Sequence, residues 1–225
     1  ITRVTHDVSA NRSFSLRVPS APIAELHTLS QDFNSLLTEL EAWENHMRNE
    51  NVSLTQKALH DGLTGLHNRA FFIDTLNQCF NPMRPALSLA LLFIDVDNFK
   101  EINDSLGHAA GDRVLMVIGE RLAKTLRKGD VLARLGGDEF AILLEPMVST
   151  AEAVAFAERI VEIMKTPVIL LNNKTLDVSL SIGIALSPSQ ATNAKELLDK
   201  ADEAMYRKKK ISGSCWHVSS GMPLP

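Results

Sequence analysis

The chain has 225 residues, of which 45% are hydrophobic and 22% are charged, and its formal net charge is −4. These values are ordinary for a soluble globular protein with one sizeable domain and a smaller element, and no excess of basic residues points to nucleic acid. The longest predominantly apolar stretch, residues 87–94, is too short to cross a bilayer, and two distant cysteines, Cys79 and Cys215, argue for a reducing compartment. Because the sequence starts without methionine inside a helical pattern, we expect it to be part of a longer protein.

Helical periodicity dominates the first sixty residues. Apolar residues at 1, 4 and 8 indicate a short helix, and a second helix is expected from residue 23 onward. The apolar positions of this second helix alternate spacings of four and three, as in a coiled-coil seam: Leu29, Phe33, Leu36, Leu40, Trp43 and Met47. We interpret this seam as the contact of a parallel dimer. The alternative is a helix packed on its own globular domain.

The heptad pattern changes after the last seam residue. An unbroken heptad would place Glu50 and Lys57 in the seam, whereas one extra four-residue step places Asn51, Leu54 and Ala58 there. The second pattern is a stutter, which locally unwinds a supercoil. We therefore expect this helix to pass rotational or packing changes to the part of the chain that follows it.

Glycines at 62 and 65 break the helical pattern and mark the main domain boundary. Beyond them, periodicity predicts helices over residues 69–79, 114–129, 153–164 and 194–210. Strands are predicted over 87–96, 131–133, 140–144, 168–171 and 175–187, with a polar loop over 98–111. Interleaved helices and strands that include two hairpins predict an α+β fold with a mixed, ferredoxin-like sheet.

Two acidic pairs stand at the ends of predicted strands. Asp95 and Asp97 close the buried strand, and Asp138 and Glu139 follow the glycine pair of a hairpin. Taken alone, Gly-Gly-Asp-Glu is more typical of a solvated turn. If the two strands are neighbours, however, Asp95, the carbonyl of Val96 and Asp138 can share one cation.

The chemistry of these donors suits magnesium. Mg²⁺ takes one or two carboxylates and fills its other positions with water and phosphate oxygens. In the segment between the acidic pairs, Asn103 and Asp112 suit the edge of a base, and Lys100 suits a phosphate. The sequence therefore predicts a Mg²⁺-dependent nucleotide site.

Three motifs in this region resemble one family. Residues 134–140 read Arg-Leu-Gly-Gly-Asp-Glu-Phe, and residues 61–69 read Asp-Gly-Leu-Thr-Gly-Leu-His-Asn-Arg. Residues 95–104 read Asp-Val-Asp-Asn-Phe-Lys-Glu-Ile-Asn-Asp and are followed by Gly-His and Gly-Asp. Over residues 61 to about 212 the chain resembles the GGDEF-domain diguanylate cyclases. The resemblance implies a palm-type fold, condensation of two GTP molecules into cyclic di-GMP and pyrophosphate, and Mg²⁺ or Mn²⁺ as cofactor.

The resemblance also implies roles for individual residues. Metal binding is expected of Asp95, the Val96 carbonyl and Asp138. Substrate binding is expected of Asn103 and Asp112 at guanine and of Phe99, Lys100 and Lys209 at phosphate. The catalytic set is Gly136, Gly137, Asp138, Glu139 and Lys100. Since each domain would hold one GTP, a homodimer is required, and Gly213 stands where the family usually has a further phosphate-contacting arginine.

A second site of the family is matched upstream of the hairpin. Arg127 and Asp130 resemble its RxxD inhibitory motif, and Arg159 resembles the second arginine that often completes it from a neighbouring domain. This implies that cyclic di-GMP binds there as an inhibitor, since guanidinium forks bind phosphate and guanine edges. The alternative is an ordinary ion pair at a helix end.

The N-terminal part resembles a truncated HAMP domain, because residues 23–26 and 33–34 fit its second helix, although Ala21 and Pro22 replace the usual acidic pair. We therefore expect a HAMP domain over residues 1–46, a signalling helix over 47–60 and a GGDEF domain over 61–225. This implies the cytoplasmic portion of an inner-membrane protein with a periplasmic regulator, as in the YfiN-type cyclases of Gram-negative bacteria. Two other functions stay open: a non-catalytic cyclic di-GMP or GTP receptor, and a dimerisation relay.

Overall fold

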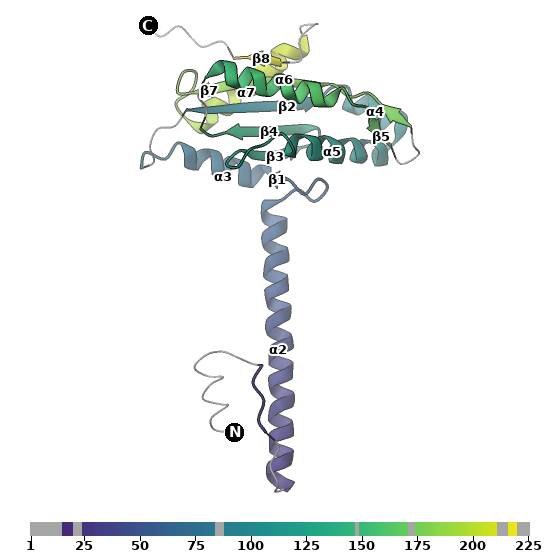
Figure 1. Ribbon diagram of the computed structural model, residues 1–225, viewed down its shortest axis with the longest axis vertical. Coiled ribbons are helices and arrows are strands. Elements are labelled where there is room, and N and C mark those ends of the chain that lie inside the picture. Colours follow the sequence, from purple (N-terminus) through teal and green to yellow (C-terminus); the bar gives the residue numbers. More distant parts are fainter. Residues whose placement is uncertain are drawn as a thin grey trace. The chain divides into compact units, whose positions relative to one another are not determined.

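The computed structural model describes residues 15–19, 24–83, 88–146, 149–170, 174–210 and 216–219 (Figure 1). Within α2 and α7, the side chains of residues 24–26, 51–54, 56 and 208–210 are not described. The chain forms two compact units, Ile1–Gln56 and Lys57–Pro225, and each is treated by itself below. The short helix predicted at residues 1–8 lies outside the described residues.

Helix α2 (Ala24–Leu59), most of which belongs to the first unit, lies where the second helix was predicted and runs without a break for 36 residues. An extended segment lies against it, with the side-chain amide of Asn34 accepting from the Val18 N–H at 2.7 Å and donating to the Val18 carbonyl at 2.9 Å. Arg17 forms an ion pair with Glu41 at 2.8 Å. Val18 and Leu37 are buried, so these contacts occupy a face of α2 that differs from the predicted seam.

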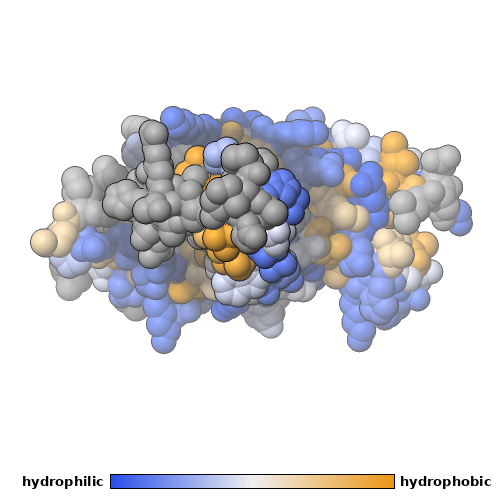
Figure 2. Space-filling view, turned by 90° about the horizontal axis from the view of Figure 1, so that it is seen from below, coloured by the Kyte–Doolittle hydropathy of each residue, from blue (hydrophilic) through white to orange (hydrophobic). Residues whose placement is uncertain are grey.

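The predicted seam faces solvent in the described chain. Five of its six residues are exposed: Leu29, Leu36, Leu40, Trp43 and Met47. Phe33 is half-buried. In the view of Figure 2, hydrophobic side chains interrupt the otherwise hydrophilic surface. A seam whose apolar residues are exposed at coiled-coil spacing is the pattern expected of a helix that needs a partner. The stutter stays a prediction, since the side chains of Asn51 and Leu54 lie outside the described part.

The second unit is built on a six-stranded sheet with the order β1-β3-β4-β2-β7-β8 (Figure 1). Its strands are β1 (His67–Asn68), β2 (Leu89–Val96), β3 (Val131–Gly136), β4 (Glu139–Leu144), β7 (Leu180–Ser187) and β8 (Trp216–Val218). The β1–β3 and β7–β8 pairs are parallel and the other pairs are antiparallel. The prediction of a mixed sheet in an α+β fold is therefore confirmed.

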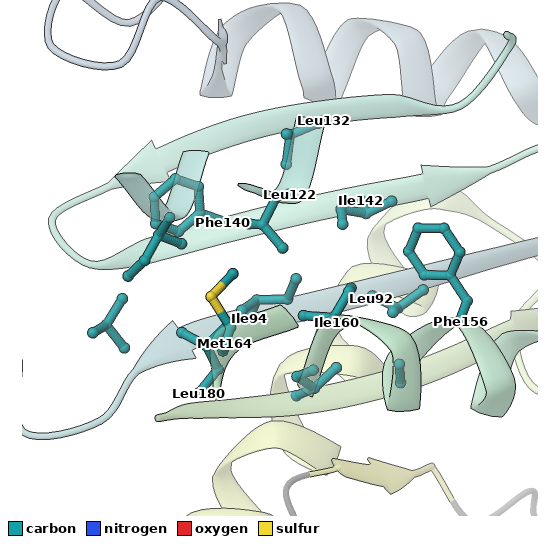
Figure 3. Close-up of a cluster of buried hydrophobic side chains, with 14 of the residues drawn as sticks. Leu92, Ile94, Leu122, Leu132, Phe140, Ile142, Phe156, Ile160, Met164 and Leu180 are labelled. Carbon is teal, nitrogen blue, oxygen red and sulfur yellow. The ribbon is translucent and has the colours of Figure 1, made fainter. Parts of the chain in front are cut away.

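Helices cover both faces of this sheet, and every residue of the central strand β2 is therefore buried. Leu92 and Ile94 point into a core beneath α5 (His108–Ala123) and α6 (Thr150–Met164), as Figure 3 shows. Leu91 and Phe93 point the opposite way, into a core beneath α3 (Arg69–Cys79) and α7 (Ala194–Lys210). Alternation with period two thus feeds two cores from one strand, and each fully buried leucine or isoleucine contributes roughly 1.5–3 kcal/mol.

Helix α7 lies unusually close to β7. A Cβ atom at Gly183 would overlap the carbonyl oxygen of Ala201 and the backbone of Met205. Only a residue without a side chain permits this approach. This contact fixes α7, the helix that carries Asp202, against the sheet.

Three sequence predictions of local structure are wrong. The polar loop predicted over 98–111 is helical, as α4 (Phe99–Leu106) and the first turn of α5, because Phe99 and Ile102 pack against the core. The strand predicted over 175–187 is two strands: β6 (Thr175–Leu176) pairs with β5 (Val168–Ile169) in a separate sheet, and β7 starts at Leu180. Helix α5 ends at Ala123, before the predicted stop at 129, because the Thr125 amide and hydroxyl both donate to the Leu122 carbonyl.

Candidate functional site

The two acidic pairs meet where β2 and β4 run side by side. Asp95 lies directly opposite Glu139 in the antiparallel register, and the Val96 N–H donates to the Asp138 carbonyl at 3.3 Å. Asp95 is buried, whereas Asp138 and Glu139 are half-buried. The sequence required the two strands to be adjacent, and this condition is met. The predicted metal residues lie together at one end of the two central strands, and we call this place the acidic corner.

The hairpin that carries Asp138 depends on its glycines. Gly136 and Gly137 have φ angles of 145° and 55°, and residues other than glycine rarely adopt such backbone angles. The register shifts between Arg134 and Gly136, so the turn contains a bulge. No atom lies within 4 Å of a Cβ built at either glycine, and the space above this backbone is therefore open to a ligand.

Arg134 stabilises this hairpin through hydrogen bonds to its backbone. Its Nε and Nη2 donate to the Gly137 carbonyl at 3.1 and 2.8 Å, and its Nη1 donates to Asp61 at 3.0 Å. The Asp61 carboxylate also accepts from the amide and hydroxyl of Thr64. Asp61 and Arg134 both belong to sequence motifs, but the sequence did not predict their contact, because they are 73 residues apart in the chain.

The electrostatics of the acidic corner favour a cation. Burial raises the pKa of Glu139, and the neighbouring charges of Asp202, Asp95 and Asp138 raise it further. Asp202 comes from α7 and was not predicted as a site residue; burial, and then the charge of Asp199, raise its pKa as well. Carboxylates held this close repel one another, and a cation bound among them would offset that repulsion.

The donor set fits magnesium with a bound nucleotide better than an ion held by protein alone. Within the described ranges, no group of three or more His, Cys, Asp or Glu side chains is arranged to enclose a metal ion. Magnesium typically binds through one or two carboxylates and takes its remaining oxygens from water and phosphate. Asp95, Asp138 and the Val96 carbonyl satisfy that requirement without closing the site.

Asp97 is directed elsewhere. Its carboxylate accepts from the Ser179 and Ser181 hydroxyls at 2.7 and 2.6 Å, and its N–H donates to the Ser179 carbonyl at 3.0 Å. Asn98, the next residue, has a left-handed backbone with φ of 55°. Asp97 therefore anchors the turn between β2 and α4 to β7, and this turn sets where α4 starts.

Four of the predicted nucleotide residues lie on α4 and α5, which pack closely together. A Cβ at Gly111 would overlap the side-chain oxygen of Asn103 and press on the Phe99 ring. Asn103 is half-buried against this glycine, and Asp112 and Lys100 are exposed. The backbone of α7 includes Lys209, but its side chain lies outside the described part, as does Gly213.

A separate pocket holds the predicted inhibitory residues. We call it the arginine pocket: a cavity of about 250 Å³ lined by Thr125, Arg127, Asp130, Leu144, Glu152, Ala155, Phe156 and Arg159. Arg159 donates to the Thr125 carbonyl at 2.7 Å, and its guanidinium lies 4.7 Å from the centre of the Phe156 ring. The three predicted residues thus line one cavity within a single chain. Glu152 was not predicted.

A family model described as “Diguanylate cyclase, GGDEF domain” matches residues 58–214. The chain belongs to the GGDEF family of diguanylate cyclases. Diguanylate cyclase TpbB of Pseudomonas aeruginosa is 49% identical over 216 residues, which cover 95% of this chain and 50% of TpbB. Diguanylate cyclase DgcN of Escherichia coli is 44% identical over 209 residues, which cover 93% of this chain and 51% of DgcN. This GGDEF chain therefore spans about half the length of these curated relatives.

Solved structures share the fold. A structure of TpbB, also called YfiN, that comprises only the GGDEF domain has a TM-score of 0.68 and 48% identity, covering 72% of this chain and 94% of that one. The coiled coil and GGDEF domain of DgcB from Caulobacter crescentus, solved in complex with c-di-GMP, has a TM-score of 0.72 and 25% identity, covering 83% and 98%. These likenesses support the GGDEF fold of the second unit.

Proposed function

We propose that this chain is the catalytic part of a diguanylate cyclase that condenses two GTP molecules into cyclic di-GMP and pyrophosphate. The observation that carries the proposal is the acidic corner, where Asp95, the Val96 backbone and Asp138 lie beside an open glycine hairpin. Family membership and the two diguanylate cyclases reported above support it. The acidic corner offers what phosphoryl chemistry needs, which is positioned charge and room for a polyphosphate.

Each residue of the site has a proposed role. Asp95, Asp138 and the Val96 carbonyl would hold Mg²⁺ or Mn²⁺, which when bound offsets the charge of the phosphates. Gly136 and Gly137 let GTP lie against the backbone, and Glu139 either assists the metal or takes the proton of the attacking hydroxyl. The remaining contacts are Asn103 and Asp112 to guanine, and Phe99, Lys100 and Lys209 to phosphate.

The reaction requires two sites that face each other. The 3′-oxygen of one GTP forms a bond to the α-phosphorus of the other, the bond from that phosphorus to the bridging oxygen breaks, and pyrophosphate leaves. The same exchange in the opposite direction closes the ring. Since one domain holds one GTP, we propose a homodimer, and the exposed seam of α2 at coiled-coil spacing supports it.

Turnover by matched variants tests this proposal. Purified chain with GTP and Mg²⁺ should form cyclic di-GMP, and Asp138→Asn should lower the rate at least about a hundredfold because it removes a metal carboxylate. Asp74→Asn, an exposed substitution on α3 with the same charge change, should leave the rate unchanged. Tight binding of cyclic di-GMP with no turnover at any protein concentration would instead favour the non-catalytic receptor.

The arginine pocket supports a second proposal, feedback inhibition by cyclic di-GMP. Arg127, Asp130 and Arg159 line one cavity, and guanidinium groups bind phosphate in a forked geometry. Replacing Arg127 with Ala should raise the cyclic di-GMP concentration that halves the rate by at least about tenfold. Unchanged inhibition in that variant would show that the arginine pocket is not the inhibitory site.

The N-terminal unit supports a proposal about signalling. The hydrogen bonds of Val18 with Asn34 and the ion pair of Arg17 with Glu41 hold an extended segment against α2, as a HAMP connector would be held. We propose a HAMP domain over 1–46 and a signalling helix over 47–60, within the cytoplasmic portion of an inner-membrane protein that has a periplasmic regulator. Among the helices that the structure describes, none has both the length and the apolar composition to cross a membrane.

A further inference from the structure

The arginine pocket carries as many negative as positive side chains. Arg127 and Arg159 stand in its walls together with Asp130 and Glu152, so two positive and two negative charges sum to zero. A site for an anionic ligand would normally present net positive charge. The pocket therefore offers two guanidinium groups but has no net positive charge, and both of its carboxylates pair with Arg127.

Every nitrogen of the Arg127 guanidinium already has a partner. Nε donates to Asp130 at 3.3 Å, Nη1 donates to Glu152 at 3.0 Å, and Nη2 donates to the Pro146 carbonyl at 2.5 Å. A phosphate bound by an arginine fork needs two of these N–H groups. Three of the five N–H groups of Arg127 are already used, and the Glu152 carboxylate lies on Nη1, one of the two terminal nitrogens. An anionic ligand that approaches the terminal edge of Arg127 therefore competes with the charge of Glu152 for that edge.

The two carboxylates differ in how easily they can be displaced. The Asp130 side chain is 1% exposed and also accepts from the backbone N–H of Arg127 at 3.0 Å, so it is a fixed part of the wall. The Glu152 side chain is 36% exposed and belongs to the first turn of α6, which Ser149 caps. Rotation of Glu152 toward solvent releases Nη1 at little cost, since half-exposed ion pairs contribute little free energy.

We infer that Glu152 is an internal competitor for the ligand of the arginine pocket. Its carboxylate occupies the place of a phosphate on Nη1 of Arg127, at the positive end of α6 where an anion is favoured. The inference rests on the proposed inhibitory role of the pocket and assigns Glu152 a part that this role does not include. Glu152 sets the affinity for cyclic di-GMP and hence the product concentration at which inhibition begins.

Calorimetric titration of the full chain with cyclic di-GMP tests this inference. Glu152→Gln and Glu152→Ala both remove the competing charge, and each should bind cyclic di-GMP about fivefold more tightly than the unchanged chain. Glu158→Gln changes the same helix and the same net charge outside the pocket, and it should bind as the unchanged chain does. The gain from Glu152→Gln should shrink at high salt, because it is electrostatic.

Arg127→Ala separates failure of the inference from failure of the proposed site. If both Glu152 variants bind no more tightly than the unchanged chain while Arg127→Ala binds more weakly, the inhibitory pocket stands and the competitor role is overturned. If Arg127→Ala binds as tightly as the unchanged chain, the ligand does not use this pocket, and both proposals are overturned. Thermal unfolding without ligand reports any loss of fold: a merely structural Glu152 would lower the midpoint without raising affinity.

Discussion

The guanidinium of Arg134 lies 3.0 Å from the carboxylate of Asp61 and donates to the carbonyl of Gly137, so it joins the turn after α2 to the signature hairpin. Burial alone would raise the pKa of Asp61, but hydrogen bonds from Thr64 and Arg134 outweigh it and lower that pKa. Because the hairpin carries Asp138, a change in this turn reaches the proposed metal site through one side chain.

Asp61→Asn should lower the free energy of unfolding by about 1–2 kcal/mol near neutral pH, measured by urea titration, because it removes a charged acceptor. The folded pKa lies below the ordinary value, so this contribution is present above about pH 4 and is lost as the pH falls through the folded pKa. Glu203→Gln, which breaks an exposed pair with Arg207, is the control and should cost less than about 0.5 kcal/mol. Equal effects of the two variants would contradict the stabilising role of Asp61.

Asp202→Asn should shift the acidic limb of the rate profile to lower pH. Asp202 is the charged neighbour that does most to raise the pKa of Glu139, so removing its charge lets Glu139 ionise at lower pH. The measurement is the initial rate of cyclic di-GMP formation at saturating GTP and Mg²⁺ across pH. Asp74→Asn makes the same charge change at an exposed position on α3 that is not among the charges acting on Glu139, and it should leave the limb in place; an identical shift in both variants would refute the argument.

Protonation of His67 should lower the free energy of unfolding of the second unit at acidic pH. Its ring stacks on Phe71 with centroids 3.7 Å apart, and burial followed by the charge of His60 lowers its pKa, although a hydrogen bond to the Leu59 backbone opposes this. The unfolded chain therefore takes up this proton first, and stability falls as the pH drops below about 6.5 until the folded pKa is reached.

His67→Phe keeps an aromatic ring but removes the titrating group. Thermal midpoints between pH 7 and 5 should fall less steeply for this variant than for the unchanged chain. His108→Gln, which removes an exposed histidine, should not alter the slope. A slope that His67→Phe leaves unchanged would show that other groups govern the acid dependence.

Gly111→Ala should weaken GTP binding. The added Cβ would overlap the side-chain oxygen of Asn103, so the proposed guanine contact must move or α4 must shift, and overpacking of this kind costs about 1–3 kcal/mol. We expect the KM for GTP to rise about tenfold, with a smaller change in kcat. Gly62→Ala meets no atom within 4 Å and should leave both parameters unchanged. An unchanged KM for GTP in Gly111→Ala would contradict the proposed contact between Asn103 and guanine.

Short-range pattern was enough to predict the parts of the fold that repeat. The apolar run of β2, the alternation in β7 and the glycine pair at 136–137 specify strands and a hairpin by local physics, and the structure has them there. The stretch 98–111 was mistaken for a loop because its polar composition hides Phe99 and Ile102, whose packing against the core stabilises the short helix α4. Strands β1 and β8, of two and three residues, are too short to leave a periodic signal.

The candidate site was predictable only where its residues lie in motifs. Asp95 and Asp138 stand out because acids at strand ends are costly without a cation. Asp202 and Glu152 lie in ordinary amphipathic helices, and only folding brings them to Glu139 and Arg127. Likewise, the use of Asp97 as an anchor for Ser179 and Ser181 follows from the register of β2 and β7, which the sequence does not reveal.

The most direct test is chromatographic measurement of cyclic di-GMP formed from GTP and Mg²⁺ as a function of protein concentration, with Asp138→Asn alongside. We expect one cyclic di-GMP for every two GTP consumed, and a specific activity that rises with concentration until the dimer is complete, because each domain supplies half of the reacting pair. Asp138→Asn should be at least about a hundredfold slower at every concentration. No product at any concentration would contradict the proposed reaction, and a specific activity independent of concentration over a range where the chain passes from monomer to dimer would contradict the shared site.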